Sequence, residues 1–478
     1  MIQFEIKKNL QHPEEFCYDL RSLAQSFYPE KKCKIVERED LIGEEGYPVR
    51  CLIDGEEVLS VTLAAGYDKN AVKRVVYEAF VKKCKRILSW GILTGIRPAK
   101  IAFRMCQSGR DLEEIRNVLR KEYLVGDRKA DLAADVANKE YELVRELDYE
   151  RGYSIYIGIP FCPSICGYCS FSSFSYSAYE SKITSYLMAL EKEMAAVAAQ
   201  KDGYRLHTIY VGGGTPTSLN EPELLKLMDM IHKYFSVETA LEFTVEAGRP
   251  DSLTADKLAI LKRAGVTRIS INPQTMKQHT LELLGRKHTV EQVKDAFAMA
   301  REAGFDNINM DLILGLPEED EVDFYNTLLQ VQKMDPDSVT IHTLVIKRAS
   351  EMRRRQLDQN EGIRAEDTLI PILQRESEDM MRSFGYQPYY MYRQKNKAGT
   401  TRNTNQENVA YAKAGKECLY NILIMEELET IIALGSGGST KYVIPEENRM
   451  ERIENVKNVE DYINRIDEMI ERKERLWH

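Results

Sequence analysis

The middle of the chain, residues 153 to 346, alternates between two hydrophobic patterns. Short runs of apolar and β-branched residues, most of which end near Gly, Pro or a polar cluster, are typical of buried strands. Between these runs, apolar residues recur every three or four positions, as at Ile183, Leu187 and Leu190, which indicates amphipathic helices. The predicted strands cover residues 154–161, 208–212, 241–246, 268–273, 308–314 and 338–345.

Six strand–helix units in a row predict an α/β fold, with a parallel sheet and helices outside it. Asn220 followed by Glu223, and Thr289 followed by Gln292, have the spacing of capping boxes at the starts of two of these helices. Six units do not close an ordinary eight-stranded barrel, so we expect a partial (β/α)6 barrel over residues 151–350. Its functional site is expected at the carboxyl ends of the strands.

The segments on either side of this core have other patterns. In residues 1–150, two apolar runs flank Asp54-Gly55, a strong hairpin signal, and helical stretches follow, so we expect an N-terminal α+β accessory domain. Residues 351–478 are predicted to form a mostly helical C-terminal region, which ends in a charged helix over residues 451–475.

The composition indicates a globular protein, but it does not indicate a particular activity. Of the 478 residues, 43% are hydrophobic and 29% are charged, which is typical of a globular protein with a large core. The net charge of −9 argues against a protein that coats nucleic acid. No window approaches the ~18 apolar residues of a membrane span, and the first residues lack the apolar core of a signal peptide. We therefore expect a cytoplasmic protein.

Three of the nine cysteines lie within eight residues, in the spacing C-x3-C-x2-C directly after a predicted strand. In a reduced compartment such a cluster is typical of a metal site rather than of disulfides. The thiolates of Cys162, Cys166 and Cys169 can ligate three irons of a [4Fe–4S] cluster and leave the fourth iron open. Zinc is the alternative, although a structural zinc site would need a fourth Cys or His, and none is nearby.

The segment YIGIPFCPSICGYC, residues 156–169, resembles the radical S-adenosylmethionine superfamily and, more narrowly, the oxygen-independent coproporphyrinogen III oxidase family. The resemblance spans residues 151–350 and continues more weakly to 440. It is supported by further motifs in the order of that family: GGGTP at 212–216, EFTVE at 242–246, RISINPQ at 268–274, GR at 285–286 and NMDLILGLP at 309–317. The arrangement of the whole chain looks most like the branch called coproporphyrinogen dehydrogenase HemZ.

The resemblance implies a cofactor site for S-adenosylmethionine beside the cluster. Carboxylates and amides at strand ends can hold ribose hydroxyls and an aminoacyl group, and a guanidinium can pair with a carboxylate. Tyr156 matches the tyrosine near the sulfonium and is the residue expected to take part in catalysis, while Tyr168 is expected to contribute its backbone. The other expected cofactor residues are Gly213, Gly214, Thr215, Glu246, Gln274, Arg286, Asp311 and Ile313. The family prototype holds a second S-adenosylmethionine, and the last two of these residues, with Gln274 and Arg286, match that pair of sites.

The resemblance implies the oxidative decarboxylation of coproporphyrinogen III to protoporphyrinogen IX, with an electron donor such as a flavodoxin or ferredoxin. Two positions beside the cluster depart from the family, since residue 158 is Gly instead of His and residue 171 is Phe instead of a further Cys. The loss of that Cys is shared with the haem-chaperone branch. A haem-binding trafficking protein is therefore the alternative, although that branch lacks the long N-terminal domain.

Residues 69–104 contain ten Lys or Arg and a single acid, Glu78. A solvated helix face is the ordinary explanation of such a run. The alternatives are an electropositive surface that gathers a tetracarboxylate substrate, or radical modification of a nucleic acid. Nucleic acid is not the partner we expect for this chain.

Overall fold

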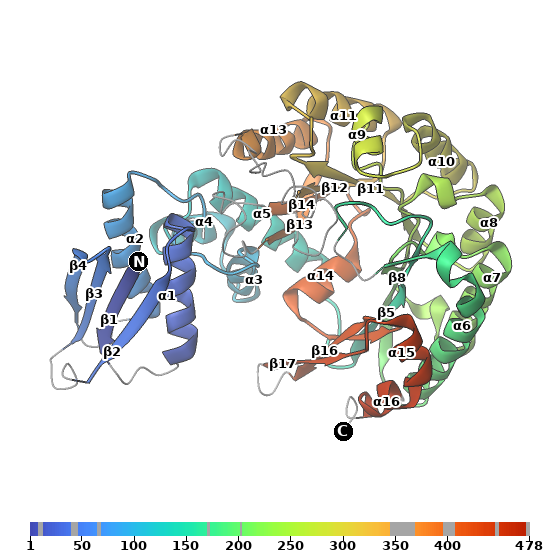
Figure 1. Ribbon diagram of the computed structural model, residues 1–478, viewed down its shortest axis with the longest axis horizontal. Coiled ribbons are helices and arrows are strands. Elements are labelled where there is room, and N and C mark those ends of the chain that lie inside the picture. Colours follow the sequence, from blue (N-terminus) through green and yellow to red (C-terminus); the bar gives the residue numbers. More distant parts are fainter. Residues whose placement is uncertain are drawn as a thin grey trace. The chain divides into compact units, whose positions relative to one another are not determined.

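The computed structural model describes residues 1–7, 13–39, 46–64, 68–169, 173–200, 203–344, 369–394, 407–444 and 449–474 (Figure 1). The chain forms two compact units. The N-terminal unit comprises Met1–Glu142 and Met391–Asn408, and the barrel unit comprises Leu143–Tyr390 and Val409–His478. None of the helices in these described ranges is long and apolar enough to cross a membrane.

The six predicted strands of the barrel unit are confirmed, and they lie next to one another in a parallel order. Each is a short run that is buried almost throughout, as is typical of parallel strands covered on both faces. In chain order they are β5 (Gly152–Ile159), β8 (Arg205–Gly213), β9 (Glu242–Glu246), β10 (Arg268–Ser270), β11 (Ile308–Leu314) and β12 (Ser338–Thr343).

The connecting helices form an arc outside these strands (Figure 1). They are α6 (Tyr176–Ala198), α7 (Glu221–Tyr234), α8 (Ala255–Arg263), α9 (Gln278–Leu283), α10 (Val290–Glu302) and α11 (Glu321–Met334). Both predicted capping boxes are present, at Asn220 with Glu223 and at Thr289 with Gln292. The sheet has separate edge strands, so the α/β fold with an open, partial barrel is confirmed.

The C-terminal region differs from the expected, mostly helical one, because it also contributes strands to the same sheet. At one edge, β15 (Thr430–Leu434) pairs in parallel with β5 and is followed by the antiparallel β16 (Ser439–Ile444) and β17 (Arg449–Glu454). At the other edge, β14 (Glu407–Ala412) pairs antiparallel with β12, and β13 (Gln387–Arg393) lies outermost. The described helices here are α13 (Leu369–Ser383), α14 (Leu419–Glu426), α15 (Val459–Asn464) and α16 (Ile466–Glu471).

The expected charged helix over 451–475 is wrong at its start, where the chain forms the edge strand β17. Its sequence, RMERIE, is polar on both faces and mainly exposed, so it lacks the apolar alternation by which a half-buried strand is recognised. Charged side chains on an edge strand discourage pairing with other chains, which explains why such a strand can be so polar.

The N-terminal unit contains a four-stranded sheet in the order β2 (Cys33–Arg38), β1 (Ile2–Lys7), β3 (Tyr47–Ile53) and β4 (Glu56–Leu63). The predicted hairpin between β3 and β4 is confirmed. Asp54 and Gly55 have φ values of 52° and 89°, as a two-residue turn with left-handed backbone at both positions requires. Three further helices, α3 (Ala99–Gln107), α4 (Leu112–Lys121) and α5 (Asp127–Val144), follow the sheet.

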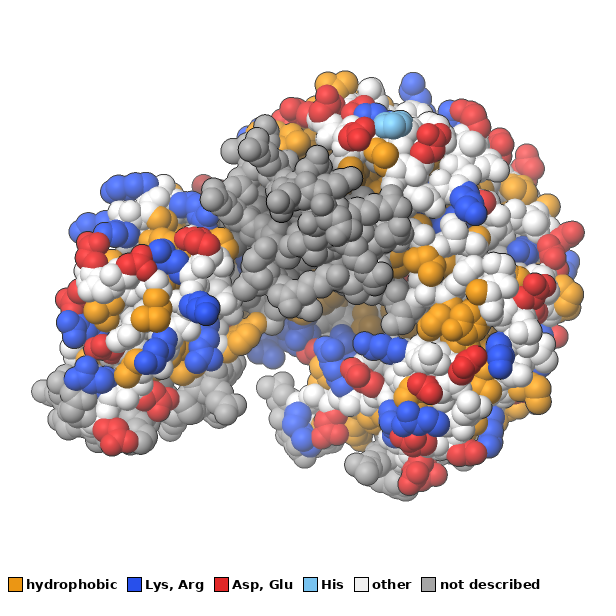
Figure 2. Space-filling model, viewed as in Figure 1, with side chains coloured by type: hydrophobic (Ala, Val, Ile, Leu, Met, Phe, Trp, Pro, Cys, Tyr) orange, Lys and Arg blue, Asp and Glu red, His pale blue; other side chains and the backbone are white. Residues whose placement is uncertain are grey.

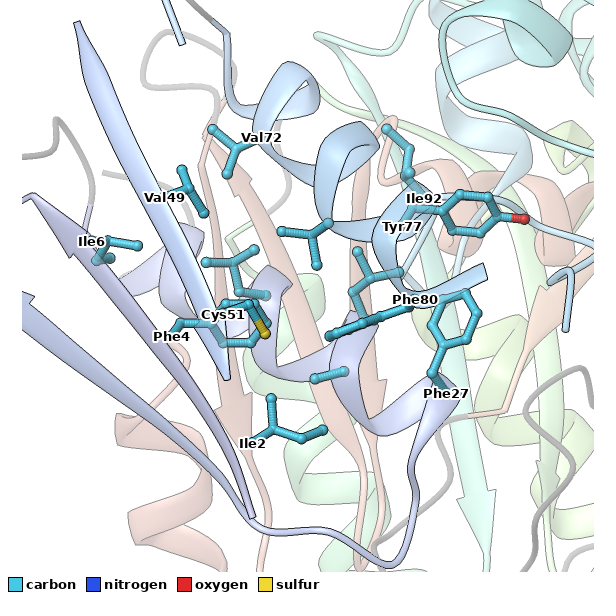
Figure 3. Close-up of a cluster of buried hydrophobic side chains, with 14 of the residues drawn as sticks. Ile2, Phe4, Ile6, Phe27, Val49, Cys51, Val72, Tyr77, Phe80 and Ile92 are labelled. Atoms are coloured by element: carbon cyan, nitrogen blue, oxygen red, sulfur yellow. The ribbon is translucent and has the colours of Figure 1, made fainter. Parts of the chain in front are cut away.

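The core of this unit lies between the sheet and two helices, α1 (Pro13–Phe27) and α2 (Lys69–Cys84) (Figure 3). Phe80 of α2 packs edge-on against Phe27 of α1, with the ring centroids 5.4 Å apart, and lies 6.2 Å from the ring of Phe4. Two lysines of α2 are paired with acidic side chains: Lys83 with Glu56, and the buried Lys73 with Asp19. On the face shown in Figure 2, basic and acidic side chains of this unit are interspersed.

Candidate cofactor site

The cysteine loop, residues 162–169, begins directly after β5 and is fixed at its base by backbone hydrogen bonds. Gly214 and Thr215, which follow β8, donate from their backbone N–H groups to the carbonyls of Ile159 and Phe161, at 2.8 and 2.7 Å. The strand β6 (Phe161–Cys162) pairs with β7 (Phe174–Ser175), which closes the base of the loop. The sequence therefore brings the predicted cysteines and the GGGTP segment to the same end of the sheet.

The three thiols of this loop lie close enough to influence one another. Burial raises the pKa of Cys162, and the neighbouring Cys166 and Cys169 raise it further, while a hydrogen bond from Thr215 Oγ1 to its Sγ, at 3.5 Å, lowers it. As the described residues stand, no three His, Cys, Asp or Glu side chains are already arranged to hold a metal ion. Phe171, at the position where the family has a further Cys, lies outside the described residues.

Gly212 and Gly213 end β8 and Gly214 follows it, and close contacts or backbone conformation require a glycine at each position. A Cβ atom on Gly214 would lie 2.6 Å from the carbonyl oxygen of Phe161, and one on Gly212 would lie 2.8 Å from Cδ of Glu246. Gly213 has a φ of 108°, which side chains rarely allow. These glycines therefore let the end of β8 pack closely against Phe161 and Glu246. The approach of this backbone to a ligand stays a prediction.

Glu246 ends β9 and points toward this glycine segment. Tyr210 Oη donates a hydrogen bond of 2.7 Å to Glu246 Oε1, and the backbone N–H of Gly213 also donates to the carboxylate. Burial raises the pKa of Glu246 to about 7, and the nearby negative charge of Asp311 adds to that rise against the hydrogen bond from Tyr210. The carboxyl can therefore hold or release a proton near neutral pH.

Asp311 lies on β11 and remains charged. Asn309 Nδ2 donates to Asp311 Oδ1 at 2.7 Å, and His342 Nε2 of β12 lies 3.8 Å from Oδ2. Burial would raise the pKa of Asp311, but His342 and Asn309 outweigh it and hold the pKa below its usual range. The side chain of His342 therefore lies beside Asp311 in the candidate site.

Gln274 has an unusual backbone for a residue with a side chain. Its φ is 68°, and its N–H and C=O groups bond to Asp311 O and Ile313 N, at 2.9 and 3.0 Å. The side chain is 8% exposed, and its Oε1 has no hydrogen-bond partner among the described residues. Left-handed backbone costs roughly 1–2 kcal/mol for such a residue, so the amide is held here at an energetic cost.

Arg286 and Tyr168 are placed differently from the sequence interpretation. The two Nη atoms of Arg286 donate to the carbonyls of Gly248 and Asn272, both at 2.9 Å, and to Tyr168 Oη at 3.2 Å. These bonds occupy the edge of the guanidinium that would pair with a ligand carboxylate, and only Nε lacks a partner among the described residues. Tyr168 presents its side chain as well as its backbone, because its ring packs in a cluster that includes Ile313.

Tyr156 is the first of three stacked tyrosines inside the curve of the sheet. Its ring centroid lies 6.1 Å from that of Tyr210, which lies 4.5 Å from that of Tyr420. Tyr420 comes from α14, whose first backbone N–H groups donate to the carboxylate of Glu242, that of Leu419 at 2.6 Å. Sequence reasoning missed Tyr210 and Tyr420, because only the fold brings α14 to β8.

Arg249 was also missed, although it follows β9 by three residues. Its side chain is 4% exposed and reaches the cysteine loop at Ser164 and Cys166. A basic residue at a strand end beside a predicted metal loop is the signal that could have identified it.

Comparison with known proteins agrees with this arrangement. The family model described as the Radical SAM superfamily matches residues 156–331. The oxygen-independent coproporphyrinogen-III oxidase-like protein HemZ of Bacillus subtilis (strain 168) is 39% identical over 409 residues, which cover 85% of this chain and 80% of that protein. The heme chaperone HemW of the same organism is 43% identical over 195 residues, which cover 41% of this chain and 51% of that protein.

Among solved structures, the coproporphyrinogen III oxidase HemN of Escherichia coli, described as a radical SAM enzyme, matches with a TM-score of 0.54. The match covers 67% of this chain and 70% of that chain at 23% identity, which shows that the fold is shared. Together with the HemZ comparison, it shows that the chain belongs to the radical SAM superfamily and, within it, to the family of oxygen-independent coproporphyrinogen III oxidases and their HemZ-like relatives.

Proposed function

We propose that this protein catalyses the oxygen-independent oxidative decarboxylation of coproporphyrinogen III to protoporphyrinogen IX. One observation carries the proposal: the cysteine loop, the glycines at the end of β8 and two carboxylates belong to the same parallel sheet, in a chain that resembles HemZ over most of its length. The carboxylates are those of Glu246, at the end of β9, and Asp311, within β11. The carboxyl ends of parallel strands are where α/β folds bind and transform their substrates.

Membership of the superfamily implies a [4Fe–4S] cluster and S-adenosylmethionine, and the residues present fit both groups. Cys162, Cys166 and Cys169 would hold three irons, because thiolates are the ligands such clusters prefer. The unpartnered amide oxygen of Gln274 can accept a hydrogen bond from a ligand. When bound, the two cofactors together supply a one-electron cleavage that yields a carbon radical able to remove hydrogen from a propionate side chain.

The chain itself binds and orients the cofactor. Glu246 and Asp311 offer carboxylate oxygens to hydroxyl or amino groups, and Gly213 and Gly214 allow the backbone to approach closely. Tyr210 keeps Glu246 in one orientation, and the hydrophobic side chain of Ile313, 6% exposed, helps to exclude water. Water exclusion strengthens these polar contacts and protects a radical from side reactions.

The proposal also includes the partners that the reaction needs. We propose a one-electron donor of the flavodoxin or ferredoxin class and a second S-adenosylmethionine beside the first. Removal of a hydrogen atom, carbon dioxide and one further electron from each of two propionates leaves two vinyl groups, so an electron acceptor completes each turnover.

A second candidate function is haem binding without turnover. It is favoured by the 43% identity with the heme chaperone HemW over 195 residues and by Phe171 in place of a further Cys. The long N-terminal unit favours the HemZ branch over the chaperone, since the HemZ match covers 85% of this chain and the HemW match covers 41%.

One anaerobic assay separates these functions. Reconstituted protein is incubated with S-adenosylmethionine, reduced flavodoxin, coproporphyrinogen III and an added electron acceptor, and the products are identified by mass spectrometry. We expect protoporphyrinogen IX, carbon dioxide, methionine and 5′-deoxyadenosine, none of which should form with the chain in which the three loop cysteines are Ala. Haem binding without 5′-deoxyadenosine or decarboxylated porphyrin would contradict the oxidase and support the chaperone.

A further inference from the structure

The guanidinium of Arg249 lies between the end of β9 and the cysteine loop, and all its N–H groups donate hydrogen bonds. Its Nη1 donates to the carbonyl of Ser164 at 3.1 Å and lies 3.7 Å from Sγ of Cys166, within hydrogen-bond reach of a sulfur acceptor. Its Nη2 donates to Oγ of Ser164 at 3.0 Å. These three bonds join one buried side chain to both the backbone and a predicted ligand of the loop.

Asp251 fixes the orientation of that guanidinium from the other side. Its two carboxylate oxygens accept from Nε and Nη2 of Arg249, at 2.9 and 2.8 Å, in the bidentate geometry that Arg adopts with carboxylates. All five N–H donors of Arg249 therefore have a partner. A Lys cannot reproduce such a fork, because its ammonium group is a point charge on a flexible chain.

From this geometry we propose that Arg249, held by Asp251, is a positioning residue that fixes the cysteine loop and donates to the ligand sulfur of Cys166. This inference rests on the proposed cluster site. Partners that orient metal ligands control both the affinity for the metal and its electronic properties. A buried positive charge that donates to a ligand sulfur favours the reduced, more negative cluster and raises its reduction potential.

Four single variants test this role. Arg249→Gln removes the charge and most of the fork, Arg249→Lys retains the charge, and Asp251→Asn removes the carboxylate that orients Arg249. Arg301→Gln is the matched control. Arg301 bonds to Asp337 and to backbone carbonyls just before β11 and β12. These contacts lie at the amino ends of the strands, whereas the cysteine loop lies at the carboxyl ends.

Three measurements are made without substrate. Iron loss from the reconstituted cluster to a chelator should be about tenfold faster in Arg249→Gln than in the wild type, as is typical when a group that supports a metal ligand is removed. The reduction potential, followed by EPR, should fall in Arg249→Gln and change less in Arg249→Lys. In the iron-free chain, the backbone amides of Gly167 and Cys169 should exchange hydrogen faster in all three variants of Arg249 and Asp251 than in the wild type. Arg301→Gln should match the wild type in every measurement.

Unchanged iron loss and potential in a folded Arg249→Gln protein, judged by circular dichroism, would overturn the proposal. If that variant does not fold, Arg249→Lys and Asp251→Asn decide it, because faster iron loss in both supports the role and wild-type behaviour in both refutes it. These measurements do not depend on the porphyrin, so a cluster that responds as expected in a chain without decarboxylase activity would refute the proposed reaction and leave the role of Arg249 intact.

Discussion

His288 should make the barrel unit sensitive to acid. It lies between α9 and α10, is fully buried, and neither ring nitrogen has a hydrogen-bond partner among the described residues. Burial lowers the pKa of His288 to about 3, and the positive charges of Arg286 and Arg249 reinforce that shift against the attraction of Asp251. The imidazole is therefore neutral in the folded protein at every pH in ordinary use.

The sign of the effect follows from proton uptake by the unfolded chain. An unfolded histidine has its ordinary pKa of 6.5, so below that pH the unfolded state binds a proton and the folded state does not. Proton binding therefore favours the unfolded state. The contribution of His288 to the free energy of unfolding is nearly at its maximum above pH 7, and it is lost as the pH falls from 6.5 toward 3. Between pH 7 and pH 5 the loss is about 2 kcal/mol, at 1.36 kcal/mol for each pH unit below the unfolded pKa.

The perturbation is His288→Leu, which removes the titration and the two unpartnered nitrogens together. The opening free energies of the amides in β10 and β11 are measured by hydrogen exchange at pH 5 and pH 7, because this local measurement does not require a chain of two units to unfold in one step. The difference between the two pH values should be about 2 kcal/mol smaller in the variant than in the wild type.

The control is Val293→Ala in the neighbouring α10, at a fully buried position. It should lower the opening free energy by about 1–3 kcal/mol at both pH values alike, because it leaves a cavity and does not titrate. The reasoning is refuted if wild type and His288→Leu lose the same free energy between pH 7 and pH 5, since His288 would then be protonated in the folded state.

Three further predictions follow from the candidate site and the N-terminal unit. Replacing all three loop cysteines by Ala should remove the bound iron, about four atoms per chain, and iron retained by the variant would show that the ligands lie elsewhere. Glu246→Ala and Asp311→Ala should each weaken S-adenosylmethionine binding by about 1–3 kcal/mol in calorimetry without changing the iron content, and equal affinity would mean that the cofactor is held by other groups. The basic run at the end of α2 and just beyond it comprises Lys82, Lys83, Lys85 and Arg86. If this run gathers the tetracarboxylate, changing all four residues to Gln should raise KM at low salt, and the effect should shrink as salt is added, whereas an unchanged KM identifies a solvated surface.

The positions of the six barrel strands along the chain could be predicted because buried parallel strands are nearly continuous apolar runs with clear ends. The exact first and last residues of these strands could not be predicted from the sequence. The run at 268–273 was expected to be one strand, but β10 ends at Ser270, and the backbone turns so that Gln274 can bond with β11. That turn depends on a partner strand, which a single segment does not reveal.

The strands of the C-terminal region were missed for a different physical reason. In β14 every residue is buried, so its side chains show no alternation, and β17 is mainly exposed and charged. Neither strand has the period of two that distinguishes a half-buried strand, and both form only because an edge of the barrel sheet is available to them.

Among the candidate site residues, sequence reasoning singled out those in motifs near strand ends and missed those that act through other side chains. Glu246, at the end of β9, and Asp311, within β11, lie close enough for the charge of Asp311 to raise the pKa of Glu246. The hydrogen bonds from Arg286 to backbone carbonyls, and those from Arg249 to the cysteine loop, could not be deduced from the sequence. A guanidinium has five donors, and the sequence does not say which acceptors surround it.

The barrel core and the C-terminal region form one functional unit, because a chain of contacts joins them. Glu242, at the start of β9, accepts hydrogen bonds from the first backbone N–H groups of α14 and thereby fixes that helix. The helix places Tyr420 against Tyr210, and Tyr210 in turn bonds Glu246 at the other end of β9. A displacement of α14 would therefore reach the carboxyl group that we propose binds the cofactor, even though α14 lies beyond the segment that carries the recognisable motifs.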